Sequence, residues 1–233
     1  MKQRIWELDA FRGICIVGMV ILHLLFDCID LFGLFSWQYP PILTFLANWG
    51  GIFFLIVSGI CVTLGRHHLK RGLCVLGFGL LCTAVTFALY KLGLFGFGIV
   101  IWFGALHCLG VCMLLWAMLR RLKPFPLLLL AVLLLCLSIW VRGIRVSVPY
   151  FTFLGLVSPE FSSGDYFPLL PYLGFFLLGA VLGKTLYREK KSLLPPVRGF
   201  GFFQFCGRNS LWIYLLHQPL LIGFVTLYDW LFQ

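Results

Sequence analysis

Stretches of roughly 20 consecutive apolar residues recur along the chain, and this recurrence limits the possible folds more than any other sequence feature. Each stretch is long enough to cross a hydrocarbon core of ~30 Å as an α-helix. With 61% hydrophobic and 11% charged residues, the chain has too few polar residues to cover a water-facing surface. The predicted spans are 10–30, 42–65, 72–91, 97–119, 125–142, 166–187 and 208–231. We predict an all-α, polytopic transmembrane helix bundle of about seven spans, forming a single integral membrane domain over residues 1–233.

Basic residues gather at alternate ends of these spans. One set of ends carries Lys2, Arg4, Arg66, Lys70, Arg71, Arg120, Arg121, Lys123, Lys184, Arg188, Lys190, Lys191, Arg198 and Arg208; the other carries Lys91, Arg142 and Arg145. This asymmetry is typical of the cytoplasmic side of membrane proteins, so it predicts a cytoplasmic amino terminus. It also accounts for the net charge of +10 without a nucleic-acid partner. The partner that the charge pattern indicates is the lipid bilayer.

The nine cysteines indicate packing rather than metal binding or cross-linking. They lie mostly inside the predicted spans, with no Cys-x-x-Cys pair and no Cys/His spacing suited to a metal. We interpret them as small apolar side chains and predict no metal site.

Ionisable residues inside the first span are the strongest indication of function. A charge at the bilayer centre costs at least roughly 2.5 kcal/mol, so such residues are functional candidates. On a helix, Arg12 and His23 share nearly one face at an axial separation of about 16 Å, and Asp27 follows His23 by one turn. A carboxylate there can orient the imidazole and stabilise its protonated form, as a general base requires.

Two further histidines, His107 and His217, fall near the middle of later spans, and Pro219 could kink the helix that carries His217. Three imidazoles at similar depth predict one shared polar cavity. The alternative is that each histidine only hydrogen-bonds a neighbouring helix.

Three other charged groups have simpler interpretations. Arg12 could extend to lipid phosphate. Asp9 and Arg12, three residues apart, predict an intrahelical ion pair. Asp165 predicts an N-cap for the following span, with a place at the outer mouth of a cavity as the alternative.

Five blocks, in order, resemble a known family. They are "LDAFRGICIVGMVILH", "FFLIVSG" followed by "RHHLKRG", "FGALHCLGVCMLL", "DYFPLLPYLGFFLLGAVLG" and "CGRNSLWIYLLHQPLL". Together they resemble bacterial relatives of heparan-α-glucosaminide N-acetyltransferase, within the transmembrane acyltransferase superfamily that includes the acyltransferase-3 enzymes. The spacing from Arg12 to His23, an arginine followed by ten residues and a histidine, is similar to the first-span motif of the acyltransferase-3 enzymes.

The resemblance implies a multi-pass enzyme of a bacterial-type plasma membrane. Such an enzyme takes an acyl group, usually acetyl, from coenzyme A on the cytoplasmic side and passes it to a sugar amine or hydroxyl reached from the other side. The resemblance implies His23 as the catalytic residue and Arg12 as part of the same site. Acetyl-CoA is then a substrate, and a carbohydrate or another small molecule is the acceptor.

The sequence hypothesis assigns roles to nine residues. Arg12 foremost, with Arg66, Lys70, Arg71 and Arg208, would bind the phosphates of coenzyme A. His23, oriented by Asp27, would act as the base, and His217 or His107 would donate a hydrogen bond to the oxyanion.

Several alternatives stay open. A covalent acyl-histidine route would use the same His23. A proton-coupled transporter or flippase would use the histidines as a relay, and a non-catalytic scaffold would use them only to join helices. The oligomeric state is also open, with a homo-oligomer as one alternative.

Overall fold

The computed structural model describes residues 4–34, 36–141, 144 and 149–232. Over these residues every regular element is a helix, and the only β pairing is an isolated bridge between Phe103 and Tyr166. The prediction of a polytopic helical membrane protein is confirmed. Three residues of the predicted basic pattern, Lys2, Arg142 and Arg145, lie outside the described residues.

The helices follow the predicted spans to within a few residues, with one exception. They are α1 (Trp6–Phe26), α2 (Pro41–Leu64), α3 (His68–Lys91), α4 (Ala105–Leu119), α5 (Pro124–Val141), α6 (Leu169–Thr185), α7 (Gly201–Arg208) and α8 (Ser210–Phe232), with short helical turns η1 (Asp27–Leu31), η2 (Phe97–Ile99) and η3 (Pro149–Leu154). Within the described residues, five helices are long and apolar enough to cross a membrane, and α4 and α6 are shorter apolar helices.

The exception is the predicted span 97–119, whose start was wrong: the helix begins only at Ala105. Between η2 and Ala105 the backbone is not helical, and side chains satisfy its hydrogen bonds. Thr86 accepts from the amide of Ile101 at 3.1 Å, and Ser163 accepts from the amide of Trp102 at 3.2 Å. Such side-chain bonds give the backbone an alternative to helix, and they join partners that are distant in sequence.

The chain folds into two compact units. The first unit comprises Met1–Phe54 and Lys191–Gln233, and the second comprises Leu55–Lys190. The prediction of one domain over residues 1–233 stays a prediction.

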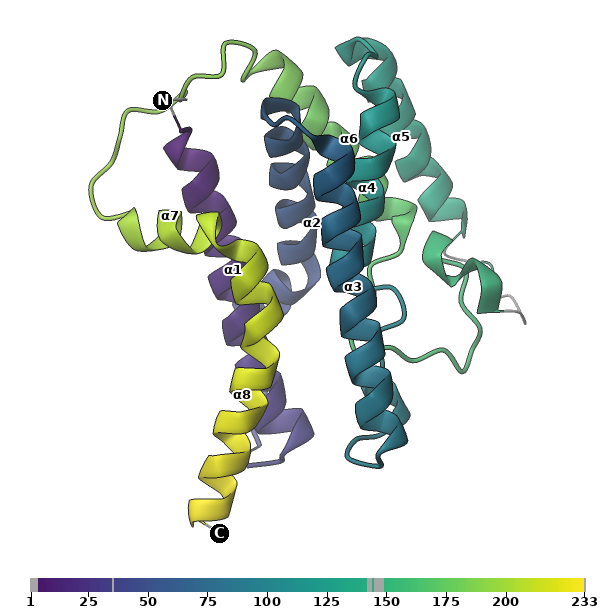
Figure 1. Ribbon diagram of the computed structural model, residues 1–233, viewed down its shortest axis with the longest axis vertical. Helices are drawn as coiled ribbons and strands as arrows, with labels where there is room; N and C mark the ends of the chain where they lie inside the picture. Colours follow the sequence, from purple (N-terminus) through teal and green to yellow (C-terminus); the bar gives the residue numbers. More distant parts are fainter. Residues whose placement is uncertain (1–3, 35, 142–143, 145–148, 233) are drawn as a thin grey trace. The chain divides into compact units, whose positions relative to one another are not determined.

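In the first unit, α7 lies across α1, and α8 runs beside α1 (Figure 1). Two glycines allow the α1–α7 crossing. A Cβ atom on Gly13 would overlap the carbonyl of Phe203, and one on Gly207 would overlap the carbonyl of Asp9. Small residues at such crossings let membrane helices approach backbone to backbone. The approach places the start of α8 against α1.

In the second unit, α4 is the central helix, with nine of its 15 residues buried. It packs against α3 and α6, and α6 also packs against α5. The glycines of "GAVLG" lie against the second half of α2, since a Cβ on Gly179 would overlap the carbonyl of Ile56 and one on Gly183 would overlap Thr63. This G-x-x-x-G spacing is the pattern that membrane helices use for close packing.

Adding one methyl group at the α1–α7 crossing should destabilise the first unit. We expect Gly13→Ala to lower the free energy of unfolding by about 1–3 kcal/mol, because the overlapped atom is backbone and cannot rotate away. The matched control is Gly18→Ala on the same helix, where nothing lies within 4 Å of the added atom. Thermal unfolding in detergent measures both, and equal stability of the two variants would contradict the crossing.

Candidate active site

The seam between α1 and α8 in the first unit brings together two of the three predicted histidines. The imidazole rings of His23 and His217 lie with centroids 4.9 Å apart and planes at 73°. His23 lies near the carboxyl end of α1, and His217 lies about two turns into α8. The residues were predicted from spans far apart in sequence, and their contact defines the candidate site.

Each of these rings is oriented by a carbonyl of its own helix. His23 Nδ1 lies 2.9 Å from the carbonyl oxygen of Met19, and His217 Nδ1 lies 2.6 Å from that of Tyr214. A carbonyl can only accept, so Nδ1 of each ring carries the proton. In the neutral rings Nε2 is therefore a free base, and His217 in that form cannot donate to an oxyanion.

Asp27 completes the site from the first residue of the η1 turn. It is fully buried, and its Oδ1 accepts a 2.9 Å hydrogen bond from the side-chain amide of Gln218. The η1 turn is a π-helix, with the amide of Phe32 bonded to the carbonyl of Asp27 at 2.9 Å. Such turns are frequent at functional sites. The ring of His23 is thus oriented by Met19, whereas the sequence predicted that Asp27 would orient it.

The seam carries most of the unpartnered polar atoms in the described part of the chain. Among the described residues, six buried side-chain nitrogen or oxygen atoms have no hydrogen-bond partner. Four of the six belong to α1, η1 and α8: Arg12 Nε, Asp27 Oδ2, His217 Nε2 and Gln218 Oε1. An unsatisfied buried polar atom costs about 1–3 kcal/mol. Such a group in a native structure calls for an explanation, and a bound water or ligand is the usual one.

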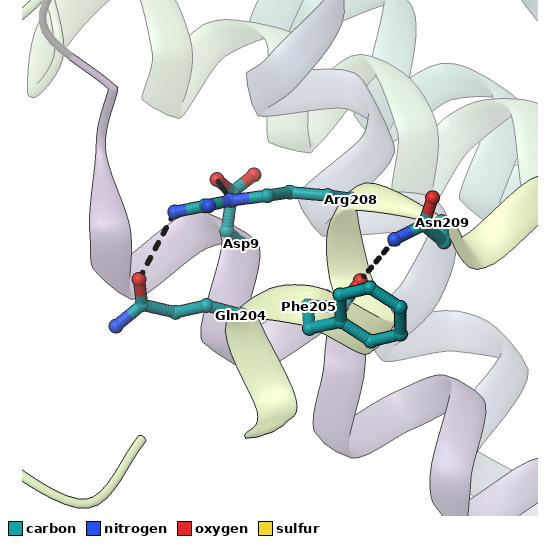
Figure 2. Close-up of polar contacts among 5 residues, drawn as sticks. All are labelled: Asp9, Gln204, Phe205, Arg208 and Asn209. Carbon is teal, nitrogen blue, oxygen red and sulfur yellow. Dashed lines mark hydrogen bonds and ion pairs between the residues drawn. The ribbon is translucent and has the colours of Figure 1, made fainter. Parts of the chain in front are cut away.

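The predicted Asp9–Arg12 ion pair is wrong. Asp9 instead accepts from Arg208 Nε at 3.1 Å, and Arg208 also donates to the side-chain oxygen of Gln204 at 3.1 Å (Figure 2). The crossing of α7 over α1 brings Arg208 to Asp9. Arg12 is left to donate to the hydroxyl of Ser210, at 2.8 Å, where α8 begins.

Arg208 remains a candidate phosphate ligand only in competition with these two partners. Its side chain is 40% exposed, so the pair with Asp9 is a weak surface interaction. The other predicted phosphate ligands, Arg66, Lys70 and Arg71, are exposed around the turn between α2 and α3 in the second unit.

The third predicted histidine, His107, has a structural environment in the second unit. It is 3% exposed, its Nδ1 accepts from the amide of Gly104 at 3.2 Å, and its Nε2 lies 3.2 Å from the hydroxyl of Thr83. Thr83 donates its own proton to the carbonyl of Ile101, so it must accept from Nε2–H. Both ring nitrogens are therefore engaged, and the ring caps the start of α4.

Asp165 caps the same helix, α4, rather than the span that follows it in sequence. Its Oδ2 accepts from the amide of Ala105 at 2.8 Å. Asp165 is thus an N-cap, as expected, but it caps α4 and not α6, the helix that follows it in sequence and packs against α4.

Two tyrosines in the segments that precede α2 and α6 have raised pKa values. Burial, together with the Asp30 carboxylate that accepts from its hydroxyl at 2.6 Å, raises the pKa of Tyr39 to about 12. Burial raises the pKa of Tyr166 to about 12, and its hydroxyl donates to the carbonyl of Thr152. Both tyrosines are therefore protonated donors at neutral pH.

Sequence reasoning missed two residues of the seam, Gln218 and Ser210. Gln218 follows His217 directly in an otherwise apolar run, and this uncharged amide inside a span was the available signal. Ser210 gave no signal, because its role depends on how α8 meets α1.

The sequence profile of the family described as heparan-alpha-glucosaminide N-acetyltransferase, catalytic, matches residues 4–219. The chain belongs to this family. The match includes Arg12, His23, Asp27 and His217, and it confirms the resemblance. No curated protein and no solved structure matches the chain.

Membership of this N-acetyltransferase family indicates a transferase embedded in the membrane. Among the described residues, no group of three or more His, Cys, Asp or Glu side chains could hold a metal ion. All nine cysteines are free thiols.

A structural role for His107 predicts a stability effect. Thr83→Val should lower the free energy of unfolding by about 1–3 kcal/mol, because it leaves His107 Nε2–H buried without an acceptor. The control Thr185→Val removes an exposed hydroxyl on α6 and should be nearly neutral. Chemical denaturation measures both. A Thr83→Val variant of unchanged stability that had lost transferase activity would assign His107 to the chemistry instead.

Proposed function

We propose that the protein is a membrane acetyltransferase that moves an acetyl group from acetyl-CoA to an amine or hydroxyl acceptor at the α1–α8 seam. The observation that supports this most is the paired imidazoles, each with a free Nε2, beside buried polar atoms that lack partners. A family of N-acetyltransferases supplies the reaction class. The reaction would take place in the plasma membrane of a bacterial-type cell, with a sugar amine or hydroxyl as acceptor.

The unpartnered atoms favour an acetyl-accepting substrate that is rich in hydrogen-bond donors. Asp27 Oδ2, Gln218 Oε1 and the free base at His217 Nε2 are all hydrogen-bond acceptors. An amine or hydroxyl group of the substrate would donate to them, and the Gln218–Asp27 hydrogen bond would keep the carboxylate in place. These contacts would hold the nucleophile beside His23.

The chemical step requires one base. His23 Nε2 would accept the proton as the nitrogen or oxygen of the acceptor attacks the thioester carbonyl. The tetrahedral intermediate would then expel the thiolate of coenzyme A, which takes the proton back from His23. His217, whose ring contacts that of His23, would accept a proton from or return one to the same region. The products are free coenzyme A and the acetylated acceptor.

Arg12 would bind the acetyl donor, acetyl-CoA. It lies about 16 Å along α1 from His23, towards the predicted cytoplasmic end. Its Nε has no partner, and the Ser210 hydroxyl orients its Nη2. A guanidinium with a free N–H suits a phosphate oxygen of coenzyme A. The long pantetheine arm would then extend along the seam towards the histidines.

Replacing His23 should remove chemistry and leave donor binding. We expect His23→Ala to lower the acetyl-transfer rate by about 10²–10⁴-fold, because the base is lost. Transfer of radiolabelled acetyl from acetyl-CoA to a panel of amino sugars by the purified protein measures this. The control His67→Asn changes an exposed histidine at the start of α3, and asparagine tolerates its left-handed backbone. Full transfer by His23→Ala would rule out this base.

Replacing Arg12 should act on the donor instead. Arg12→Ala should weaken acetyl-CoA binding by about 10–100-fold, the range for a lost charge-assisted hydrogen bond. Calorimetry on the detergent-solubilised protein measures this, with the exposed Arg198→Ala as control for loss of one positive charge. If well-folded wild type bound no acetyl-CoA but carried substrate along a pH gradient, the transporter hypothesis would replace the transferase.

A further inference from the structure

A pocket of about 460 Å³ in the second unit includes none of the seam residues in its lining and has no role in the proposed reaction. Its lining comes from the carboxyl ends of α2, α4 and α6 and the amino end of α3, with residues that follow α6. These are the ends that the basic pattern assigns to the cytoplasmic side. The pocket therefore lies at the depth of the inner lipid headgroups.

The lining of this pocket is cationic. It includes Arg120, Arg121, Lys184, Arg188 and Lys190, and no carboxylate side chain is among the described residues that line it. Arg120, Arg121, Arg188 and Lys190 are exposed and make no ion pair within the described part of the chain. Their charges are therefore available to a ligand.

Lys184 has a different role from the other cations. Its Nζ donates to the carbonyls of Arg120, at 2.7 Å, and of Leu122, and it lies 5.3 Å from the ring centre of Trp116. It thus satisfies two carbonyls of the turn that follows α4 and places a positive charge at the negative end of that helix. With those carbonyls occupied, the wall loses acceptors that would repel an anion.

Trp116 adds an unsatisfied donor to the same wall. It is 2% exposed, and its indole N–H has no hydrogen-bond partner among the described residues. A pocket with arginine, lysine and indole donors and with its carbonyls already bonded suits a ligand rich in acceptor oxygens. A phosphate group is such a ligand.

The helices beside the pocket present apolar side chains outward. Met118 is 78% exposed and Leu186 is 55% exposed, although they neighbour pocket residues in sequence. Such side chains in a membrane protein face acyl chains. A ligand with a phosphate head and hydrocarbon chains satisfies both features, and anionic lipids are concentrated in the cytoplasmic leaflet. We propose that this pocket binds the phosphate headgroup of an anionic phospholipid.

The test measures binding of labelled phosphatidylglycerol to the full-length protein in detergent micelles. Unlabelled phosphatidylcholine, inorganic phosphate and coenzyme A serve as competitors. The pocket variant is Arg121→Gln/Arg188→Gln, and the control Lys123→Gln/Arg198→Gln removes two exposed charges that do not line the pocket. A third variant, Arg121→Lys/Arg188→Lys, keeps the charge. Size-exclusion profiles confirm that each variant is folded, and all exchanged side chains are exposed.

We expect saturable binding that phosphatidylcholine does not displace. It should weaken about 30-fold in the pocket variant, the effect of two basic groups near an anionic headgroup, and stay near wild type in the other two. Three results would overturn the proposal: no saturable lipid binding, equal loss in the pocket and control variants, or displacement by coenzyme A at concentrations where inorganic phosphate does not compete. The last result would make the pocket a nucleotide site. The proposal does not depend on the transferase reaction, because lipid binding is measured without acetyl-CoA.

Discussion

Inside the hydrocarbon core, polar side chains have no bulk water to bond with, so each must find a partner in the protein or in a ligand. At the α1–α8 seam this constraint is met only in part. His23 and His217 each bond a carbonyl of their own helix, and Asp27 bonds Gln218. Asp27 Oδ2, His217 Nε2 and Gln218 Oε1 stay buried without partners, and the function proposed for the protein follows from what would bond them.

The glycine crossing of α7 over α1 sets the end of this seam that carries Arg12. Because Gly13 and Gly207 carry no Cβ, α7 lies directly on α1, and a single residue, Asn209, separates α7 from α8. Arg12 then donates a hydrogen bond to Ser210. Arg208 forms the ion pair with Asp9 (Figure 2). Arg12, which we propose binds acetyl-CoA, is thus oriented by helix packing rather than by the neighbouring carboxylate of Asp9 on its own helix.

The sequence was sufficient for the helices, but not for the tertiary partners of the polar residues. Apolar runs of span length located α1, α2, α3, α5 and α8, since a membrane segment must satisfy its backbone internally. Local pattern failed at residues 97–104, where Thr86 and Ser163 bond the backbone from afar. It also failed for Asp9 and Asp165, whose partners depend on tertiary packing. The His23–His217 contact could be suggested from depth, and the role of Gln218 could not.

The central claim is that the α1–α8 seam holds the reacting groups of an acetyl transfer. The most direct measurement is a cryo-EM structure of the protein with a non-hydrolysable acetyl-CoA analogue, at a resolution that shows ordered water. The account predicts the acyl carbon beside His23 Nε2, with water or acceptor bonded to Asp27 Oδ2 and Gln218 Oε1. An analogue bound away from the two histidines, with a seam that stays dry, would contradict it.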